Sequence, residues 1–290
     1  MKIAIVADSN SGITQAEAKE LGVTVIPTPS IINGETFLED INLTQEQFYE
    51  KLKDDSVTVS SSQPSSYDMA DTWRNLLKEN DNVIFIPISS GLSETVHSAQ
   101  HVAEDPEFAG KVFVIDNKRV SFTQKSAVLD ALALAKQGKT GKEIADWLME
   151  TSMQSSIYIT VDTLKYLKKG GRLTPAVAAI GTLLKIKPVL QIQGDKLDQF
   201  AKPRKMHDAK KIMLDAIKKD LDTRFNDLYK AGKMTIFIAH TENLAEAEIF
   251  KAEAEEYLGL PVEYINPLSL SVSVHIGPGS LAIACAVKER

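Results

Sequence analysis

The 290-residue sequence contains a single cysteine, Cys285, so no disulfide bond can form within the chain. This shortage of cysteine fits a reducing compartment. The sequence also lacks an uncharged apolar stretch of the about 20 residues that a membrane-spanning helix needs. The N-terminal apolar run is cut off by Asp8, which makes it too short for a signal peptide. We therefore expect a cytoplasmic protein with no integral membrane segment.

Basic residues are also in the minority. The chain has 33 Lys and Arg against 39 Asp and Glu, a formal net charge of −6. Proteins that bind nucleic acid through its phosphates usually carry an excess of Lys and Arg, so no nucleic-acid partner is expected. The hydrophobic fraction of 43% is ordinary for a globular protein, and the length allows one large or two ordinary domains.

The first half alternates short apolar runs with helical patterns. The runs are typical of buried parallel strands and lie at residues 3–7, 23–26, 83–88 and 112–115. The helical patterns cover residues 45–52, 65–77 and 121–137. A capping box of Thr140 and Glu143 predicts the start of another helix. This alternation favours an α/β domain with a parallel sheet.

The second half has a different order of elements. Two strands joined by a tight Gly194-Asp195 turn form a hairpin pattern at residues 188–193 and 196–200. Further strands are expected at 157–161, 234–239 and 262–265, and helices at 162–168, 206–229 and 245–258. We predict an N-terminal α/β domain, residues 1–154, and a C-terminal α+β domain, residues 155–290, with the last strand and the His275 loop at their interface. The absence of an obvious linker predicts a close-packed interface, where ligands commonly bind.

Two serine-rich segments could bind an anion. Residues 60–66 precede a helix pattern, and residues 88–95 follow a strand, where α/β folds place ligands. Both segments could instead serve only as helix caps. Residues 91–95 also nearly match the G-x-S-x-G elbow of serine hydrolases, although Thr95 replaces the second glycine. An anion site, a hydrolase nucleophile and a helix cap therefore all remain open for Ser93.

A basic segment and a glycine-rich segment follow. At residues 167–172, two lysines and two glycines suit the end of a helix, and Arg172 could pair with a carboxylate or a phosphate. Residues 277–282 fit G-x-G-x-x-A, but too little chain remains for a dinucleotide-binding unit. We interpret this segment as a rigid turn that holds His275 as a hydrogen-bond donor. His97 and His101 lie one helical turn apart without a third ligand, so no metal site is expected.

Taken in order, these segments resemble the DegV family, the fatty-acid-binding subunits of bacterial fatty acid kinase. The resemblance extends over nearly the whole chain. It rests on the sequences DSNS at 8–11, SSQP at 61–64, SSGLS at 89–93, YLKKGGR at 166–172, KP at 187–188 and HIGPG at 275–279.

The resemblance implies an N-terminal α/β domain and a C-terminal α+β domain with a lipid between them. It implies a long-chain fatty acid as ligand and a fatty acid kinase subunit as protein partner, with no catalytic residue and no cofactor beyond the bound fatty acid. The residues that would bind the carboxylate are Ser61, Ser93, Arg172 and His275, with Ser62, Gly91 and Gly277 as further candidates. Arg204 would contact the kinase.

Other interpretations of the same residues stay open. The apolar pattern of residues 174–184 could line the acyl chain or belong to an ordinary core. The protein could instead be a serine hydrolase or esterase with Ser93 as nucleophile and His275 as base, or a lipid-responsive regulatory protein without phosphoryl transfer. Glu94 stands where the family usually has glycine, and its charge would weaken binding of a carboxylate unless it points to solvent.

Overall fold

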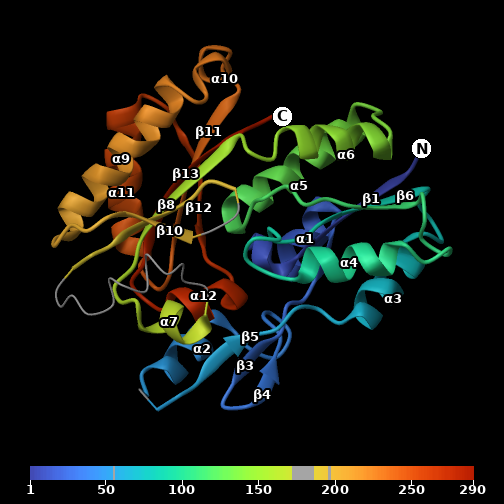
Figure 1. Ribbon diagram of the computed structural model, residues 1–290, viewed down its shortest axis with the longest axis horizontal. Coiled ribbons are helices and arrows are strands. Elements are labelled where there is room, and N and C mark those ends of the chain that lie inside the picture. Colours follow the sequence, from blue (N-terminus) through green and yellow to red (C-terminus); the bar gives the residue numbers. More distant parts are fainter. Residues whose placement is uncertain (55, 172–185, 195–196) are drawn as a thin grey trace. The chain divides into compact units, whose positions relative to one another are not determined.

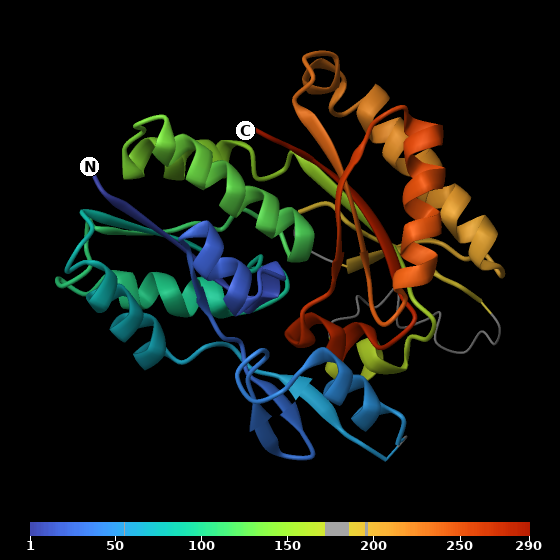
Figure 2. The ribbon, with the colours of Figure 1, turned by 180° about the vertical axis from the view of Figure 1, so that it is seen from behind.

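The computed structural model describes residues 1–54, 56–171, 186–194 and 197–290, which form two compact units (Figures 1 and 2). Unit 1 consists of Met1–Met153, Ser269–Ser271 and Glu289–Arg290, and unit 2 of Gln154–Leu268 and Val272–Lys288. Two short C-terminal segments thus group with unit 1, whereas the sequence analysis assigned all of residues 155–290 to the second domain.

Unit 1 contains a parallel sheet with the strand order β2-β1-β6-β7. The four apolar runs of the first half each supply one strand, so the predicted parallel sheet is confirmed. The strands are β1 (Ile3–Asp8), β2 (Thr24–Ile26), β6 (Asn82–Ile86) and β7 (Val112–Val114).

Helices cover both faces of this sheet (Figure 1). One face packs against α1 (Gln15–Leu21), α5 (Ser121–Lys136) and α6 (Gly141–Glu150). The other packs against α3 (Ser66–Leu76) and α4 (Thr95–Ala103), where Trp73 makes edge-to-face contacts with Phe85 and Phe108. The predicted capping box starts α6, because the Thr140 N–H donates to Glu143 and the Glu143 N–H donates to the Thr140 hydroxyl.

Unit 1 also contains a small antiparallel sheet that the sequence analysis missed. Its order is β4-β3-β5, with β3 (Ser30–Ile32), β4 (Glu35–Phe37) and β5 (Val59–Ser61), and α2 (Gln45–Leu52) follows β4 in the chain. Asn33 and Gly34 join β3 to β4 and both have positive φ, as a two-residue type I′ turn requires. The strands are only three residues long, too short to show a periodic pattern.

Unit 2 contains a mixed sheet with the order β10-β9-β8-β13-β11-β12. Neighbouring strands are antiparallel except β11 and β12, and β9 with β10 forms the predicted hairpin. The strands are β8 (Ser155–Thr160), β9 (Val189–Ile192), β10 (Leu197–Ala201), β11 (Met234–His240), β12 (Val262–Pro267) and β13 (Leu281–Val287).

The long helix predicted over residues 206–229 is wrong at its C-terminal end. The structure has α9 (Met206–Asp222) and a short α10 (Asn226–Lys230), separated by Thr223–Phe225. The Thr223 hydroxyl donates to the Lys219 carbonyl, and the turn that follows buries the Phe225 ring. Together with α11 (Leu244–Leu258), α9 packs on the sheet of unit 2 (Figure 2).

Two short helices carry residues that the sequence analysis singled out. The helix α7 (Lys165–Gly170) ends at Gly171 in the left-handed conformation, as the double glycine predicts. The interpretation of His275 as part of a glycine-proline turn is wrong, because His275 lies in the last turn of α12 (Leu270–Ile276). The helical hydrogen bonds continue to the Gly277 N–H, which donates to the Ser273 carbonyl, so the turn begins only after His275. Among the described residues, we find no helix with the length and apolar character needed to cross a membrane.

Candidate functional site

Asp8 lies at the carboxyl end of β1 in unit 1 and is fully buried. Its carboxylate accepts hydrogen bonds from the Ile88 N–H at 2.9 Å, and from the Asn10 N–H and the Gln124 side chain at 3.0 Å each. Burial raises the pKa of Asp8 above its ordinary value, although these hydrogen bonds oppose the shift. Asp8 therefore ties the ends of β1 and β6 to α5.

The loop that contains Gly91 and Ser93 follows β6. It is tightly folded, because the Ser89 carbonyl accepts from the N–H groups of Leu92 and Ser93. The Ser93 hydroxyl is partly buried and lies 2.8 Å from the Thr95 hydroxyl, at the start of α4, whereas Gly91 is exposed. The loop thus holds the Ser93 hydroxyl at a defined position.

A polar cluster holds the first part of this loop, at Ser90, in place. Asp116, which follows β7, accepts from the Ser90 N–H and the Ser90 hydroxyl, and Lys118 donates to that hydroxyl and pairs with Asp116. Burial opposes ionisation of Asp116, but the hydrogen bonds from Lys118 and Ser90 lower its pKa overall. The cluster keeps a carboxylate charge at this strand end neutralised by an ammonium group.

Glu94, the residue expected to repel a carboxylate, points to solvent. Its side chain is 78% exposed and its carboxylate lies 2.9 Å from the His97 ring nitrogen. The charge of Glu94 is therefore not expected to weaken binding of a carboxylate at this loop.

The second serine segment lies at the end of β5. Ser61 is partly buried and Ser62 is exposed, and the Ser62 N–H donates to the Pro29 carbonyl. The Gln63 side chain donates to the Ser98 hydroxyl at 2.9 Å, and Ser98 belongs to α4, the helix that starts just after Ser93. The structure thus ties the Ser61 segment to the helix that follows the Ser93 loop.

In unit 2, α7 and the residues around His275 interlock at two glycines. A Cβ atom on Gly170 would overlap Nδ1 of His275, and a Cβ on Gly277 would overlap the Tyr166 ring. Gly277 also has a φ of 77°, which an L side chain rarely adopts. Two segments of the resemblance that lie about a hundred residues apart in the sequence are thus in direct contact.

The turn after His275 has a support that the sequence analysis missed. Thr241 follows β11, and its hydroxyl lies within hydrogen-bond distance of the Gly277 carbonyl and of the hydroxyl and N–H of Ser280. The Thr241 carbonyl accepts from the Gly279 N–H. No local motif marks Thr241, because its partners lie almost forty residues away along the chain.

The candidate residues fall into three groups by position. Ser61, Ser62, Gly91 and Ser93 belong to unit 1, and His275, Gly277 and Arg204 belong to unit 2. Arg204 is exposed between β10 and α9. Arg172, the predicted helix at residues 174–184 and its apolar side chains Val177, Ile180, Leu183 and Leu184 lie outside the described residues.

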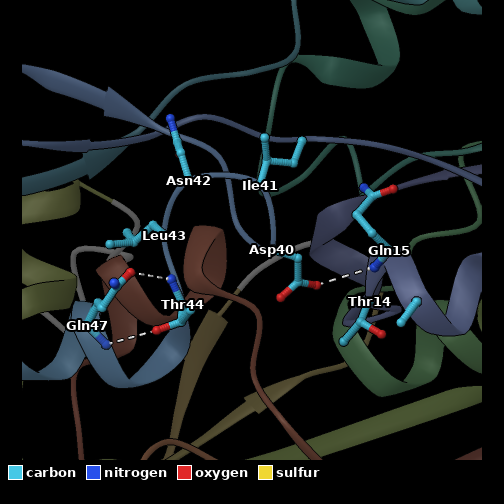
Figure 3. A pocket seen from close by; sticks show the side chains of 9 residues that line it. Thr14, Gln15, Asp40, Ile41, Asn42, Leu43, Thr44 and Gln47 are labelled. Atoms are coloured by element: carbon cyan, nitrogen blue, oxygen red, sulfur yellow. Dashed lines mark hydrogen bonds between the residues drawn. The ribbon is translucent and has the colours of Figure 1, made fainter.

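A groove of about 630 Å³ in unit 1 contains none of these candidates (Figure 3). Its polar groups serve local structure: Thr44 and Gln47 form a capping box, Thr14 caps α1, and Asp40 accepts from the Gln15 N–H. The groove therefore offers no free polar set for a ligand. Within the described ranges, no cluster of three or more His, Cys, Asp or Glu side chains could hold a metal ion.

The fold defines a class of α/β protein in which a parallel sheet with serine-rich loops at its strand ends is followed by a mixed sheet and by a glycine turn that packs closely against a short helix. The chain belongs to the DegV family: the family model, described as an uncharacterised protein, matches residues 2–288. A DegV domain-containing protein of Deinococcus radiodurans is 30% identical over 284 residues, 98% of either chain. Protein DegV of Bacillus subtilis is 31% identical over 291 residues, 99% of this chain and 100% of its own.

Solved structures of this family share the fold. A Thermus thermophilus DegV family protein, described by its fatty acid binding, is 28% identical with a TM-score of 0.87 over 99% of this chain and 100% of its own. DegV of Bacillus subtilis, described as a fatty acid binding protein, is 29% identical with a TM-score of 0.84 over the same shares. A fatty acid binding DegV family protein of Streptococcus agalactiae is 28% identical with a TM-score of 0.88 over 100% of both chains.

Proposed function

We propose that this protein binds one long-chain fatty acid in an apolar tunnel and holds its carboxylate with Ser61, Ser93, Arg172 and His275. The observation that carries the proposal is the full-length likeness, at 28–29% identity, to DegV structures described as fatty acid binding. The proposal assigns further contacts to the carboxylate to Ser62, Gly91 and Gly277.

The energetics of such a site are favourable. Burial of one methylene contributes about 0.8 kcal/mol, so a chain of about 15 methylenes supplies roughly 12 kcal/mol before the costs of association. The buried carboxylate is the unfavourable part, since an unpaired charge is expensive to desolvate. Serine hydroxyls, an imidazole and a guanidinium can each donate hydrogen bonds to it.

Two features of the described residues support this assignment. The Ser93 hydroxyl is held in place by the Ser89 turn and by Thr95, so little freedom is lost when it binds a ligand. Glu94, the nearest carboxylate in the sequence, is directed to solvent and paired with His97.

We further propose that the protein is a carrier and not an enzyme, and presents its fatty acid to a kinase subunit that phosphorylates the carboxylate to an acyl phosphate. Arg204 is our candidate for the kinase contact, and its exposed position is compatible with that role. The phosphoryl donor would be a nucleoside triphosphate bound by the kinase, and we propose a cytoplasmic location for the reaction.

The hydrolase alternative is less well supported. A nucleophile elbow holds its serine on a strained turn. Among the described residues other than glycine, positive φ occurs at Asn33, Asp40, Lys118, Ser121 and Glu242, and Ser93 is not one of them. A lipid-responsive regulatory protein would use the same pocket. Only the absence of acyl phosphate formation would distinguish it from a carrier that serves a kinase.

The test begins with native mass spectrometry of freshly purified protein, followed by extraction and identification of any released lipid. We expect one fatty acid per chain, or stoichiometric uptake of added oleate. The Ser93→Ala variant should bind oleate at least about 10-fold more weakly, because a hydrogen bond to a charged group contributes about 1.5–3 kcal/mol. Ser66→Ala, an exposed serine at the start of α3, is the matched control and should bind normally.

A ligand-free mass that does not change when oleate or palmitate is added would refute lipid binding. Covalent labelling of Ser93 by an active-site serine probe would favour the hydrolase. If the protein binds lipid but no acyl phosphate forms in the presence of a fatty acid kinase, the proposed lipid binding stands and the proposed presentation to a kinase is refuted.

A further inference from the structure

Ser30 and Ser61 lie directly opposite each other in the small antiparallel sheet of unit 1. The register pairs Ser30 of β3 with Ser61 of β5 and with Phe37 of β4. Directly opposite residues of antiparallel strands project their side chains from the same face, with Cβ atoms about 4.5–5.5 Å apart. The hydroxyls of Ser30 and Ser61 are therefore neighbours on one face.

Burial shows that this is the inner face of the small sheet. Side chains two residues apart share a face, so Ile32 and Val59 accompany the serine pair. Ser30 and Ile32 are buried, and Phe37, Val59 and Ser61 are partly buried. The exception on this face is Glu35, which lies opposite Ile32 on the edge strand β4 and is exposed. Thr36 and Ser60 on the outer face are both exposed. The inner face thus combines apolar side chains with two adjacent hydroxyls, the composition that suits the first methylenes and the carboxylate of a fatty acid.

The Ser30 hydroxyl has unused hydrogen-bonding capacity. Ser30 is 0% exposed, and its Oγ has no hydrogen-bond partner in the part of the chain that the structure describes. A buried hydroxyl without a partner costs about 1–3 kcal/mol, so native proteins rarely keep one without a reason. A ligand oxygen that accepts from this hydroxyl would remove the cost.

The segment that precedes Ser30 is held by another part of the family pattern. The Thr28 N–H donates to the Ser9 hydroxyl at 2.9 Å, and the Asn10 side chain donates to the Thr28 hydroxyl at 3.1 Å. These bonds connect the DSNS segment to the start of β3. The position of Ser30 is therefore fixed from both sides, by the anchor at Thr28 and by its strand neighbours.

We propose that Ser30 is a further ligand-binding residue of this protein, whose hydroxyl donates a hydrogen bond to the carboxylate that Ser61 also binds. The inference rests on the proposed function and deepens it. A pair of donors on adjacent strands matches the two oxygens of a carboxylate. Ser30 therefore contributes to the preference for a free fatty acid over its ester, which has no charge to attract these donors.

The test compares Ser30→Ala with the wild-type protein and with Ser60→Ala, a serine on the outer face of the neighbouring strand. Dissociation constants for oleate and methyl oleate are measured on delipidated protein, together with the melting temperatures of the ligand-free and oleate-bound forms. Ser30→Ala should weaken oleate binding about 10-fold and methyl oleate binding much less. Its ligand-free melting temperature should stay the same or rise, because the alanine leaves no hydroxyl without a partner. Ser60→Ala should match the wild type throughout.

Oleate binding by Ser30→Ala within twofold of the wild type would overturn the inference. So would a fall in the ligand-free melting temperature with an unchanged gain on adding oleate, which would mark Ser30 as structural. Failure of the wild type to bind oleate would instead refute the proposed function itself. If Ser30→Ala does not fold, Ser30→Cys retains the size of the side chain with a weak donor, and the same loss of oleate affinity is expected.

Discussion

The two units hold their candidate residues in place by different physical means. In unit 1, the loops at the strand ends are fixed by hydrogen bonds to buried polar groups, such as the three that Asp8 accepts. In unit 2, α7 and the end of α12 are fixed by close contact at glycines, where His275 and the Tyr166 ring occupy the space of absent Cβ atoms. The first arrangement depends on polar partners, and the second on the absence of a methyl group.

This difference predicts opposite sensitivities. A polar network fails when a partner is removed, because the remaining buried donors lose their acceptor. A glycine contact fails when an atom is added, because the neighbouring ring must move. Substitutions in the two units can therefore separate the two means of positioning.

The largest effect is expected for Gly277→Ala. The methyl group adds the strain of a positive φ to an overlap with the Tyr166 ring, and together these should lower the free energy of unfolding by about 4 kcal/mol. The matched control is Gly259→Ala, since Gly259 has a similar φ of 67° but an added Cβ meets no described atom within 4 Å. The control should cost about 1–2 kcal/mol in urea unfolding.

A double-mutant cycle can separate the cost of the overlap with the Tyr166 ring from the cost of backbone strain. In a Tyr166→Ala background the overlap is gone, so Gly277→Ala should cost no more than Gly259→Ala. An equal cost in both backgrounds would show that backbone strain alone accounts for the effect.

A somewhat smaller effect is expected in unit 1 for Asp8→Ala. It leaves the donors of Ile88, Asn10 and Gln124 without their acceptor and should lower the free energy of unfolding by about 3 kcal/mol. Relief of the desolvation of Asp8 offsets part of the loss. Asp146→Ala removes an exposed helical ion pair with Lys142 and should cost about 0.5 kcal/mol or less. Equal stabilities of the two variants would contradict a structural role for the Asp8 network.

The main strands and helices of both units could be predicted from the sequence, because each of them has a pattern that is local in the chain. The four apolar runs of unit 1 and the hairpin of unit 2 are each complete within a few residues. The small sheet was missed although Asn33-Gly34 is a strong hairpin signal, because its three-residue strands leave no periodicity to detect. The break after α9 was missed because burial of Phe225 depends on tertiary packing.

The candidate site residues show the same limit. Ser61, Ser93 and His275 became candidates through segments of family sequence, but the contacts that hold these segments in place could not be predicted in this way. Thr241 bonds to residues near 277–280, and Ser30 meets Ser61 only through the strand register. Such contacts join residues that are far apart in the chain, and a single sequence does not show which distant residues meet in the fold.

Glu39 is an acidic group of unit 1 whose ionisation should change the stability of the protein. Its carboxylate accepts from the Leu270 N–H at 2.7 Å, at the first residue of α12, and from the Gln45 side chain at 2.6 Å. Burial raises the pKa of Glu39 from its ordinary 4.5 to about 7, with a further contribution from the charge of Asp40. Leu270 also belongs to unit 1, so this unit contains a hydrogen-bonded carboxyl group that titrates near neutral pH.

The sign of the pH effect follows from the raised pKa. Between pH 4.5 and 7 the folded protein keeps a proton on Glu39 that the unfolded chain releases, so the free energy of unfolding falls as pH rises. After allowance for partial exposure, the loss should be about 2 kcal/mol. Glu39→Gln carries no charge, so urea unfolding should find the two proteins equally stable at pH 5 and the wild type less stable by this amount at pH 8. Other titrating groups, such as Asp8 and His240, are common to both proteins and cancel in the difference. A difference that does not change with pH would show that Glu39 ionises normally. By contrast, the cost of Gly277→Ala arises from atomic overlap and backbone strain, so it should be the same at both pH values.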